Sequence, residues 1–564
     1  MPHKSVDQLL DELDEAKRDF GAEGARVVAL LAEIGGREFD DAEALIRFHE
    51  ALLFIRAYPQ DRAAFASADA QLASFSKRVA ALLATGADPI AFDYIEYSGI
   101  AGTTLQGHYS YGFARWLTEY HAADVEIDWP RYETPERLGL VLPRLVPLIY
   151  EDTLVEANIP YRDWIQAAKP QGMSDLAWLV TQFEQSGLSE REKSAAYDSL
   201  ELWIGWRLDE SLASRTNNRR LPKSVFYHKE PLIRRNSVSL EQTIAAPLRL
   251  DKLSRGDGQQ VINHCRETTG ARYRELYGIA YGDPASVVRA DVGRGLEIFL
   301  WGLPAARRLP LRAYHAGFTL KNGVPNNYIE GITICERMEL GFNLFYTYRE
   351  GESAWVYAQV LRMLHRLTGA TCFSIDPYQI GHHNDEALES GAFWFYRKLG
   401  FRPTQPDLIK LVAREEKRIA GGDAYRTPLR TLKKLAEAPV IYELPGTPTG
   451  DWDGFRVRHL GLRVARRTAA EFDGNAVKMR AAAIKQVTRA LGIKPESLKE
   501  SERQALADFA AVLALIDDLA RWTDTEKQML VQIIRAKATS DDARYARRLQ
   551  KHQRLRAAFI ELGS

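Results

Sequence analysis

Cysteine is scarce in this chain: only Cys265, Cys335 and Cys372 occur among 564 residues, and they stand far apart. This spacing forms no disulfide framework and no metal-ligand motif, so it predicts a protein of a reducing compartment. The stretch from Met1 to Asp19 alternates charged residues with leucine and lacks the apolar core of a signal peptide. No uninterrupted apolar run approaches the roughly 20 residues that cross a bilayer. We therefore expect a cytoplasmic protein without a membrane partner.

An excess of either charge is also missing, because 75 Lys and Arg residues balance 75 Asp and Glu residues. A chain without net charge has no overall field that would recruit nucleic acid or an acidic membrane, so we expect no nucleic-acid partner. The hydrophobic content of 46% is typical of a folded soluble protein. A chain of this length exceeds one ordinary core, and we predict two to four domains.

Residues 1–213 have the apolar periodicity of an α-helical N-terminal domain. Ser5 and Gln8 have the spacing of a capping box, and Pro59 ends a later helix. The glycine-rich loop from Ser98 to Thr104 could cradle an anion with its backbone N–H groups. It lacks the lysine of a P-loop, so we favour a connection between helices that binds no nucleotide.

A basic linker is predicted at residues 214–239, where Arg215, Arg219 and Lys223 stand among asparagines and a proline. We interpret it as a solvated connection, and a phosphate-binding surface is the alternative. The segment lacks the regularly interleaved aromatic residues that stack on bases.

Residues 415–564 are predicted to form a second α-helical region. The pair Gly421-Gly422 marks its start, and an apolar stripe at helical spacing follows in the segment 506–519. The end of the chain, 535–556, is rich in Arg and Lys. We interpret this end as a solvated helix, with partner binding as the alternative.

The region between them, residues 240–414, mixes helical and strand patterns. We expect strands at Leu296–Trp301, Ala313–Leu320 and Tyr328–Cys335. The pair Asn322-Gly323 between the second and third of these runs predicts a tight turn that reverses the chain. The order therefore begins with an antiparallel meander.

The densest pattern lies in residues 341–403. Phe342–Tyr348 and Thr371–Ile375 are β-rich, and a helix from Ser353 to Gly369 joins them. We predict that these two strands are adjacent and parallel, with a right-handed crossover, and that they splay apart at their C-terminal ends. Leu408–Val412 is predicted as the last strand of the core.

Three pieces of this core resemble the GNAT acyltransferase superfamily. They are the strand-to-helix turn Tyr348–Ala354, the short strand near Thr371–Asp376 and the segment Ala392–Phe401. The last is similar to the family's closing Ala-x-x-Leu-Tyr-x-Lys-x-Gly-Phe, with Phe395 in place of leucine. The resemblance covers residues 240–412 and implies an α+β fold, a GNAT-like mixed-sheet domain flanked by two mainly α-helical regions.

This resemblance implies acetyl-CoA or another acyl-CoA as cofactor, with its pyrophosphate at the N-terminus of the helix after the turn. The cofactor-binding residues that it implies are Tyr348, Arg349, Gly351, Ser353, Ala354 and Asn384. Glu352 departs from the pattern, because the family has a glycine there. Glu389 stands where the family has an asparagine. We expect the Glu352 carboxylate at the mouth of the turn, near the first N–H groups of the helix, where it would compete with a pyrophosphate.

In GNAT-like enzymes an amine attacks the thioester carbonyl directly, without a covalent enzyme intermediate. The resemblance makes Tyr396 the general acid that protonates the leaving thiolate, although the ring could equally be a core aromatic. Glu330 and Asp376 are the candidate bases, since each could face the splayed centre of the sheet. His382 and His383 in the following loop could serve instead, and without a third ligand they form no metal site.

Two functional hypotheses remain. The first is acyl-CoA-dependent N-acyltransfer to an unidentified amine of a small molecule or a protein. The second is a non-catalytic binding or scaffold protein with a degenerate GNAT-like domain, which Glu352 favours. The helical regions could contact a protein partner under either hypothesis.

Overall fold

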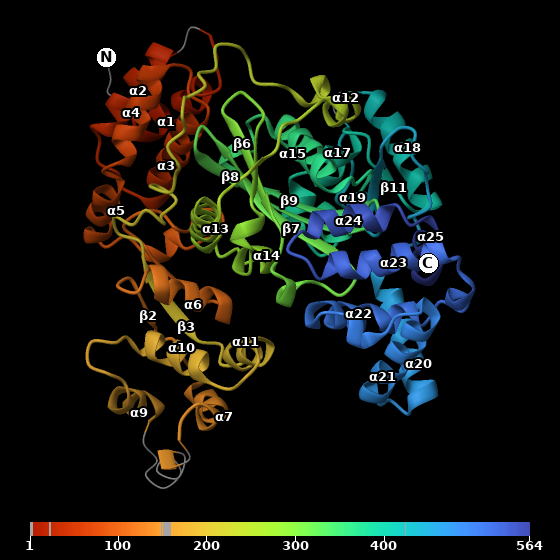
Figure 1. Cartoon of the computed structure of the whole chain (residues 1–564). Helices are drawn as coiled ribbons and strands as arrows, with labels where there is room; N and C mark the ends of the chain where they lie inside the picture. The colour runs from red at the N-terminus through yellow and green to blue at the C-terminus, as the bar shows by residue number, and fades with distance from the viewer. Residues whose placement is uncertain (1–3, 22–23, 148, 151–159, 423–424) are drawn as a thin grey trace.

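A nine-stranded mixed sheet runs through the middle of the molecule (Figure 1). The computed structural model describes residues 4–21, 24–147, 149–150, 160–422 and 425–564. The strands of the central sheet are β4 (Asp251–Lys252), β5 (Val288–Asp291), β6 (Leu296–Trp301), β7 (Ala313–Lys321), β8 (Val324–Ile334), β9 (Arg337–Leu344), β10 (Cys372–Ile375), β11 (Arg402–Pro403) and β12 (Val440–Glu443). Their order is β11-β12-β10-β9-β8-β7-β6-β5-β4. With the helices around this sheet, the chain has the α+β fold class that the sequence predicted.

The β7–β8 hairpin forms as its turn sequence predicted. Asn322 and Gly323 both have positive φ, 48° and 81°, as a two-residue turn with the twist of the flanking strands requires. The strand predicted at Tyr328–Cys335 begins earlier, at Val324, so that β8 pairs with β7 along its length.

The predicted parallel pair is present as β9 and β10, with β9 displaced toward the N-terminus. Strand β9 ends at Leu344, and Tyr346–Tyr348 is a 3-10 turn, η7, so the strand predicted at Phe342–Tyr348 was partly wrong. Pairing with β10 covers Arg337 to Glu339 of β9 and then stops, although β9 continues to Leu344. Strand β10 itself ends at Ile375, so β9 beyond Glu339 has no partner strand on this edge. The two strands are the single parallel pair in the described chain.

Helices cover both faces of the sheet because side chains alternate along its strands. The helices around the sheet are α12 (Leu240–Ala245), α13 (Arg255–Gly270), α14 (Tyr277–Ala280), α15 (Ser353–Thr368), α16 (Asp385–Glu389), α17 (Ala392–Arg397), α18 (Pro406–Ala420) and α19 (Leu429–Leu435). In β6, Ile298 and Leu300 pack in the core with α12 and α15, whereas Phe299 and Trp301 pack with α13 and α14.

The strand predicted at Leu408–Val412 is wrong. These residues lie in α18, where Leu408 and Val412 are one helical turn apart and form the buried side of an amphipathic helix. The strand that completes the core is β12, inserted antiparallel between β10 and β11. It lies within the region that was predicted to be helical, so the sheet reaches further along the chain than expected.

The N-terminal region is mainly helical, as predicted, but it also contains a small sheet. Its helices are α1 (Val6–Ala16), α2 (Gly24–Gly35), α3 (Ala42–Ala57), α4 (Arg62–Leu72), α5 (Phe75–Ala84), α6 (Tyr111–Tyr120), α7 (Leu138–Val141), α9 (Tyr161–Ala168), α10 (Asp175–Gln185) and α11 (Glu190–Asp198). The unpredicted strands are β1 (Thr104–His108), β2 (Val125–Ile127) and β3 (Trp203–Arg207), in the order β1-β3-β2. The capping box of Ser5 and Gln8 is present. The glycine-rich loop is tightly packed, since a Cβ at Gly99 would lie 2.3 Å from the Ala271 carbonyl oxygen.

The linker of residues 214–239 is not solvated throughout. Arg215 is 2% exposed and donates from one guanidinium nitrogen to both carboxylate oxygens of Glu50 on α3, at 2.8 Å each. Thr347 of η7 donates its hydroxyl to the same carboxylate. Burial alone would raise the pKa of Glu50, but Arg215 and His49 outweigh it and lower that pKa to about 2. This buried ion pair joins the N-terminal helices, the linker and the segment after β9.

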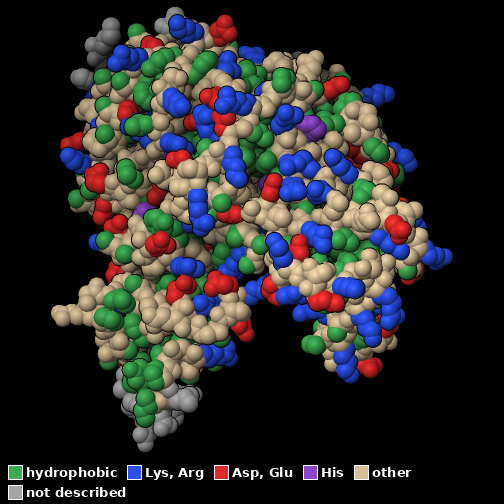
Figure 2. Space-filling model, viewed as in Figure 1, with side chains coloured by type: hydrophobic (Ala, Val, Ile, Leu, Met, Phe, Trp, Pro, Cys, Tyr) green, Lys and Arg blue, Asp and Glu red, His purple; other side chains and the backbone are tan. Residues whose placement is uncertain are grey.

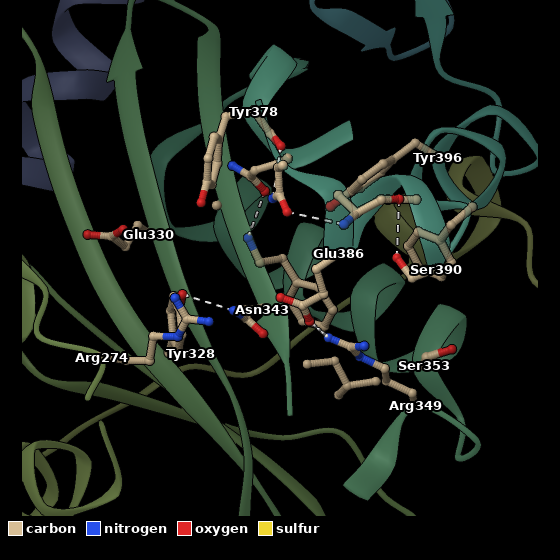
Figure 3. Close-up of a pocket in the computed structure, with 18 residues that line it drawn as sticks. Arg274, Tyr328, Glu330, Asn343, Arg349, Ser353, Tyr378, Glu386, Ser390 and Tyr396 are labelled. Atoms are coloured by element: carbon tan, nitrogen blue, oxygen red, sulfur yellow. Dashed lines mark hydrogen bonds and ion pairs between the residues drawn. The ribbon is translucent and has the colours of Figure 1, made fainter. Parts of the chain in front are cut away.

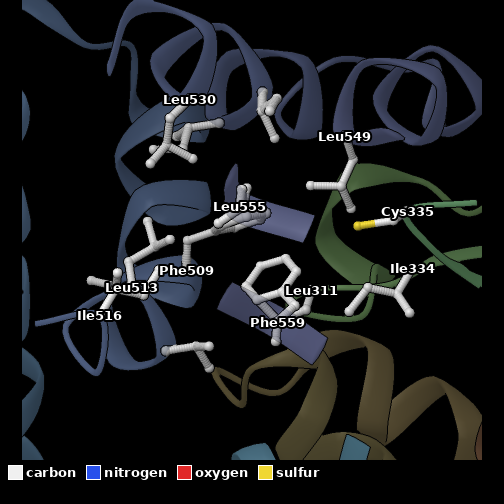
Figure 4. Close-up of a cluster of buried hydrophobic side chains, with 14 of the residues drawn as sticks. Leu311, Ile334, Cys335, Phe509, Leu513, Ile516, Leu530, Leu549, Leu555 and Phe559 are labelled. Atoms are coloured by element: carbon white, nitrogen blue, oxygen red, sulfur yellow. The ribbon is translucent and has the colours of Figure 1, made fainter. Parts of the chain in front are cut away.

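The C-terminal helices pack against one end of the central sheet. They are α20 (Val457–Phe472), α21 (Ala476–Leu491), α22 (Glu500–Leu513), α23 (Asp524–Lys537), α24 (Asp542–Gln550) and α25 (Gln553–Gly563). Figure 4 shows Ile334 and Cys335, at the end of β8, beside Leu549 and Phe559 in one apolar cluster. On the face in Figure 2, positive and negative side chains are interspersed. Among the described residues, no helix has the length and apolar character needed to cross a membrane.

Replacing Glu50 with Gln should destabilise the protein in a pH-dependent way. At pH 7 the variant leaves Arg215 buried without an anion, which costs roughly 3–5 kcal/mol. Because the folded-state pKa of Glu50 lies below its usual 4.5, its contribution is complete above pH 4.5 and is lost as the pH falls toward 2. Urea unfolding of both proteins should therefore differ at pH 7 and converge near pH 2. Glu43→Gln, at an exposed position of the same helix, is the matched control, and an equal difference at both pH values would contradict the expectation.

Candidate functional site

A cavity of about 440 Å³ lies along the part of β9 that extends beyond its pairing with β10 (Figure 3). Consecutive residues of β9, from Gly341 to Leu344, all line it. Because successive side chains of a strand point to opposite faces, a cavity that touches all four reaches both faces of the sheet. The cavity therefore passes through the gap in the sheet, and two reactants could enter it from opposite sides.

Gln379 bridges part of this gap. Its side-chain amide donates to the Leu340 carbonyl oxygen at 3.0 Å, and its oxygen accepts from the Phe342 N–H at 3.4 Å. These are the edge groups of β9 that a neighbouring strand would otherwise pair. The Gln379 side chain thus satisfies a backbone C=O and a backbone N–H group that an extended, amide-bearing ligand could bind instead.

Tyr396 on α17 faces the cavity from the same side as α15. The residue is 4% exposed, and its hydroxyl has no hydrogen-bond partner within the described residues. Its ring makes edge contacts with Tyr357 and Phe401, at centroid distances of 5.6 and 5.5 Å. Burial raises the pKa of Tyr396 above its usual value, so the hydroxyl keeps its proton at neutral pH. The side chain is both a core aromatic and a proton donor at the cavity wall.

The two candidate bases lie in different places. Glu330 on β8 lines the cavity opposite Gly341 and accepts a hydrogen bond from the Tyr314 hydroxyl. Burial raises the pKa of Glu330, although its carboxyl group points away from Tyr396 (Figure 3). Asp376 is exposed, does not line the cavity and caps a 3-10 turn by accepting from the Tyr378 N–H at 2.9 Å.

The adjacent histidines also lie outside the cavity. His382 and His383 are exposed and pack against each other, with ring centroids 4.2 Å apart. The described residues contain no group of three or more His, Cys, Asp or Glu side chains that could hold a metal ion.

Three of the implied cofactor-binding residues line the cavity: Arg349, Ser353 and Asn384. Arg349 forms an ion pair with Glu386 of α16, and Ser353 is the first residue of α15. Asn384 caps α16, since its side chain accepts from the Ala387 N–H at 3.1 Å. The start of α15 and the start of α16 therefore converge on one wall.

The other three do not line it. Tyr348 is fully buried and packs with Phe54 of α3. Gly351 lies against Tyr58, whose hydroxyl would be 2.6 Å from a Cβ at this position. Ala354 belongs to the core between α15 and the sheet. These residues shape the turn from behind and do not face the cavity.

The expected position of Glu352 at the mouth of the turn is wrong. Its side chain is fully buried and contacts Lys321 of β7 at 3.0 Å and the Arg294 Nε at 3.0 Å. The Ile233 N–H also donates to it at 3.2 Å, and it makes no cap on α15. Burial raises the pKa of Glu352, but Lys321 and Arg294 outweigh it and the net pKa is lowered. The ion pair with the buried Lys321 holds the Glu352 carboxylate away from the N-terminus of α15.

Several lining residues were not identified from the sequence: Arg274, Tyr328, Asn343, Gln379 and Glu386. None belongs to a motif: Tyr328 and Asn343 reach the cavity through the pairing of β8 with β9, and the others lie on a loop, a 3-10 turn and α16. For Tyr328 alone a signal existed, because it is two residues before Glu330 and shares its face of β8.

Comparison with known proteins adds nothing to this description of the site. No family model matches the chain, and neither the curated proteins nor the solved structures contain a match.

Glu352→Gln should destabilise the protein without improving its affinity for acyl-CoA. Lys321 is fully buried, and loss of its partner leaves an uncompensated charge that costs roughly 3–5 kcal/mol. Glu350→Gln is the matched control, since its pair with Arg18 is half exposed and is worth about 0–1 kcal/mol. Urea unfolding measures the free energy of unfolding of the two variants. Equal losses of stability would show that Lys321 does not form a stabilising ion pair with Glu352.

Proposed function

We propose that the protein transfers an acyl group from acetyl-CoA or another acyl-CoA to an amine, by direct attack of the amine on the thioester. The observation that carries this proposal is the cavity through the gap between β9 and β10. Tyr396, Glu330, Arg349 and the first residue of α15 all line it. An acyl donor and an acceptor that enter from opposite faces of the sheet would meet in this gap.

The start of α15 is suited to a pyrophosphate. The N–H groups of Ser353, Ala354 and Trp355 have no partner in the described part of the chain, as is usual in the first turn of a helix. Such groups and the helix dipole attract anions. Because Glu352 turns toward Lys321, no carboxylate of this turn occupies them.

The uncovered edge of β9 is suited to the pantetheine arm of the cofactor. This arm carries two amide groups in an extended chain, and a peptide-like chain can pair with an exposed strand edge. Gln379 would have to leave the Leu340 and Phe342 backbone groups for this to occur.

The chemistry then needs one base and one acid. Glu330 takes a proton from the amine, directly or through water, and its raised pKa makes it a stronger base than an ordinary carboxylate. The amine nitrogen forms a bond to the carbonyl carbon, and the carbon–sulfur bond breaks. Tyr396 gives its proton to the departing thiolate, and solvent restores it.

The alternative, a non-catalytic binding or scaffold protein, drew its support from Glu352. In the structure Glu352 lies in a buried ion pair away from the cavity, so its carboxylate would not compete with a pyrophosphate at the start of α15. A titration with acetyl-CoA separates the two hypotheses, because a scaffold that has lost its cofactor would not bind at millimolar ligand.

Ser353→Glu tests the cofactor site. We expect the wild type to bind acetyl-CoA in calorimetric titration, and a new carboxylate at the start of α15 to weaken binding about tenfold or more, or roughly 1.4 kcal/mol. Ser501→Glu, in the first turn of the remote helix α22, is the matched control. Unchanged affinity of the Ser353 variant would place the pyrophosphate elsewhere, and absence of binding to the wild type would exclude acyl-CoA.

Tyr396→Phe tests the general acid. Loss of its proton should lower the turnover number about 10- to 1000-fold, measured as release of free thiol with a panel of amines. Tyr357→Phe is the matched control, because this buried tyrosine contacts the Tyr396 ring, has an unpartnered hydroxyl and does not line the cavity. Equal rates of the Tyr396 variant and the wild type would remove Tyr396 from the mechanism.

A further inference from the structure

Arg274 places an unpaired positive charge on the wall of the cavity. It follows α13, is partly buried and lines both the main cavity and a small adjoining one of about 30 Å³. Its guanidinium group points toward Tyr328 and Asn343 (Figure 3). Within the described residues its side chain makes no hydrogen bond or ion pair. Arg349 on the same wall differs, because Glu386 neutralises it.

A second arginine supports the same wall from behind. Arg272 is 6% exposed, lines the small cavity and stacks on Phe345, with its guanidinium carbon 4.1 Å from the ring centroid. It donates to the Thr268 carbonyl oxygen at 2.7 Å, its Nε is unpartnered, and no described carboxylate pairs with it. Burying a cation without an anion is costly. Two such arginines beside one cavity indicate a site for an anionic group.

The remaining groups on this side can bind an amine. Asn343 donates its amide to the Tyr328 hydroxyl at 3.0 Å, which leaves the Asn343 carbonyl oxygen as an acceptor and the Tyr328 proton as a donor. Glu330 lies on the same face of β8 as Tyr328. Glu96 lines the small cavity and makes no ion pair in the described chain. Unpaired cations and unpaired carboxylates on one wall complement a molecule that carries both charges.

Resting on the proposed function, we infer that the acceptor amine also carries a carboxylate, as a free amino acid does, and that Arg274 binds this carboxylate. A guanidinium fork binds a carboxylate through two parallel hydrogen bonds and so fixes its orientation. The amino group is then held on the Asn343 and Glu330 side of the cavity. Arg272 adds positive charge behind Arg274, and the Tyr328 hydroxyl can donate a further hydrogen bond.

The test compares each amino acid with the amine formed by its decarboxylation, such as phenylalanine with phenethylamine. With wild-type full-length protein and acetyl-CoA, we expect kcat/KM to favour the amino acid by about 100-fold or more. Arg274→Met should reduce this ratio below about tenfold, and Arg274→Lys should give an intermediate ratio because the charge remains without the fork. Arg249→Met, at a highly exposed arginine, should keep the wild-type ratio.

Binding of the amino acids alone, by calorimetry, keeps this inference separate from the proposed function. If no amine is acylated, the acyltransfer proposal fails, yet loss of amino-acid binding in the folded Arg274→Met variant would still support the anion site. Equal use of amino acids and their amines by the wild type would overturn the inference. An unchanged ratio in Arg274→Met, or the absence of both turnover and amino-acid binding, would overturn it as well.

Discussion

The unequal length of β9 and β10, which leaves one edge of β9 without a partner strand, is the constraint on which the rest of the site depends. Strand β10 ends at Ile375, so its pairing with β9 ends at Glu339 while β9 continues to Leu344. Unpaired backbone groups inside a sheet are costly unless something satisfies them. Gln379 satisfies two of them. This edge of β9 is thus covered by a side chain, which can move away from it, and not by a continuous strand.

A second constraint is electrostatic. Lys321 is fully buried at the end of β7, and burial lowers the pKa of its ammonium group to about 8 even with Glu352 as its partner. An unpaired ammonium group at Lys321 would be buried without solvent, whereas the N–H groups at the start of α15 can be solvated in the cavity. The carboxylate therefore stabilises the protein more beside the lysine than at the helix terminus. The ion pair therefore orients Glu352 inward and leaves the first N–H groups of α15 available. Glu352, which the sequence led us to expect as a competitor of a pyrophosphate, contributes instead to the stability of the turn.

The features that could be predicted from the sequence are those that local chemistry determines. The Asn322-Gly323 turn and the helix that ends at Gly369 depend on neighbouring residues alone. The end of β9 could not be predicted, because Phe345 and Tyr348 are drawn into a cluster with residues of the N-terminal helices. Likewise, Tyr396 was found through a motif, whereas the roles of Arg274 and Gln379 depend on which segments the fold brings together.

The N-terminal region lines the small cavity that adjoins the main one. Glu96 lines the small cavity together with Arg272 and Tyr346. Tyr346 and Arg349 also line a further cavity of about 690 Å³ against α1 and α3. The buried pair of Glu50 and Arg215 fixes this region to η7, directly after β9. Under the proposed function, an acceptor that approaches β9 from this side would meet a surface built jointly by the central sheet and the N-terminal region, so acceptor choice would depend on the whole chain and not on the central domain alone.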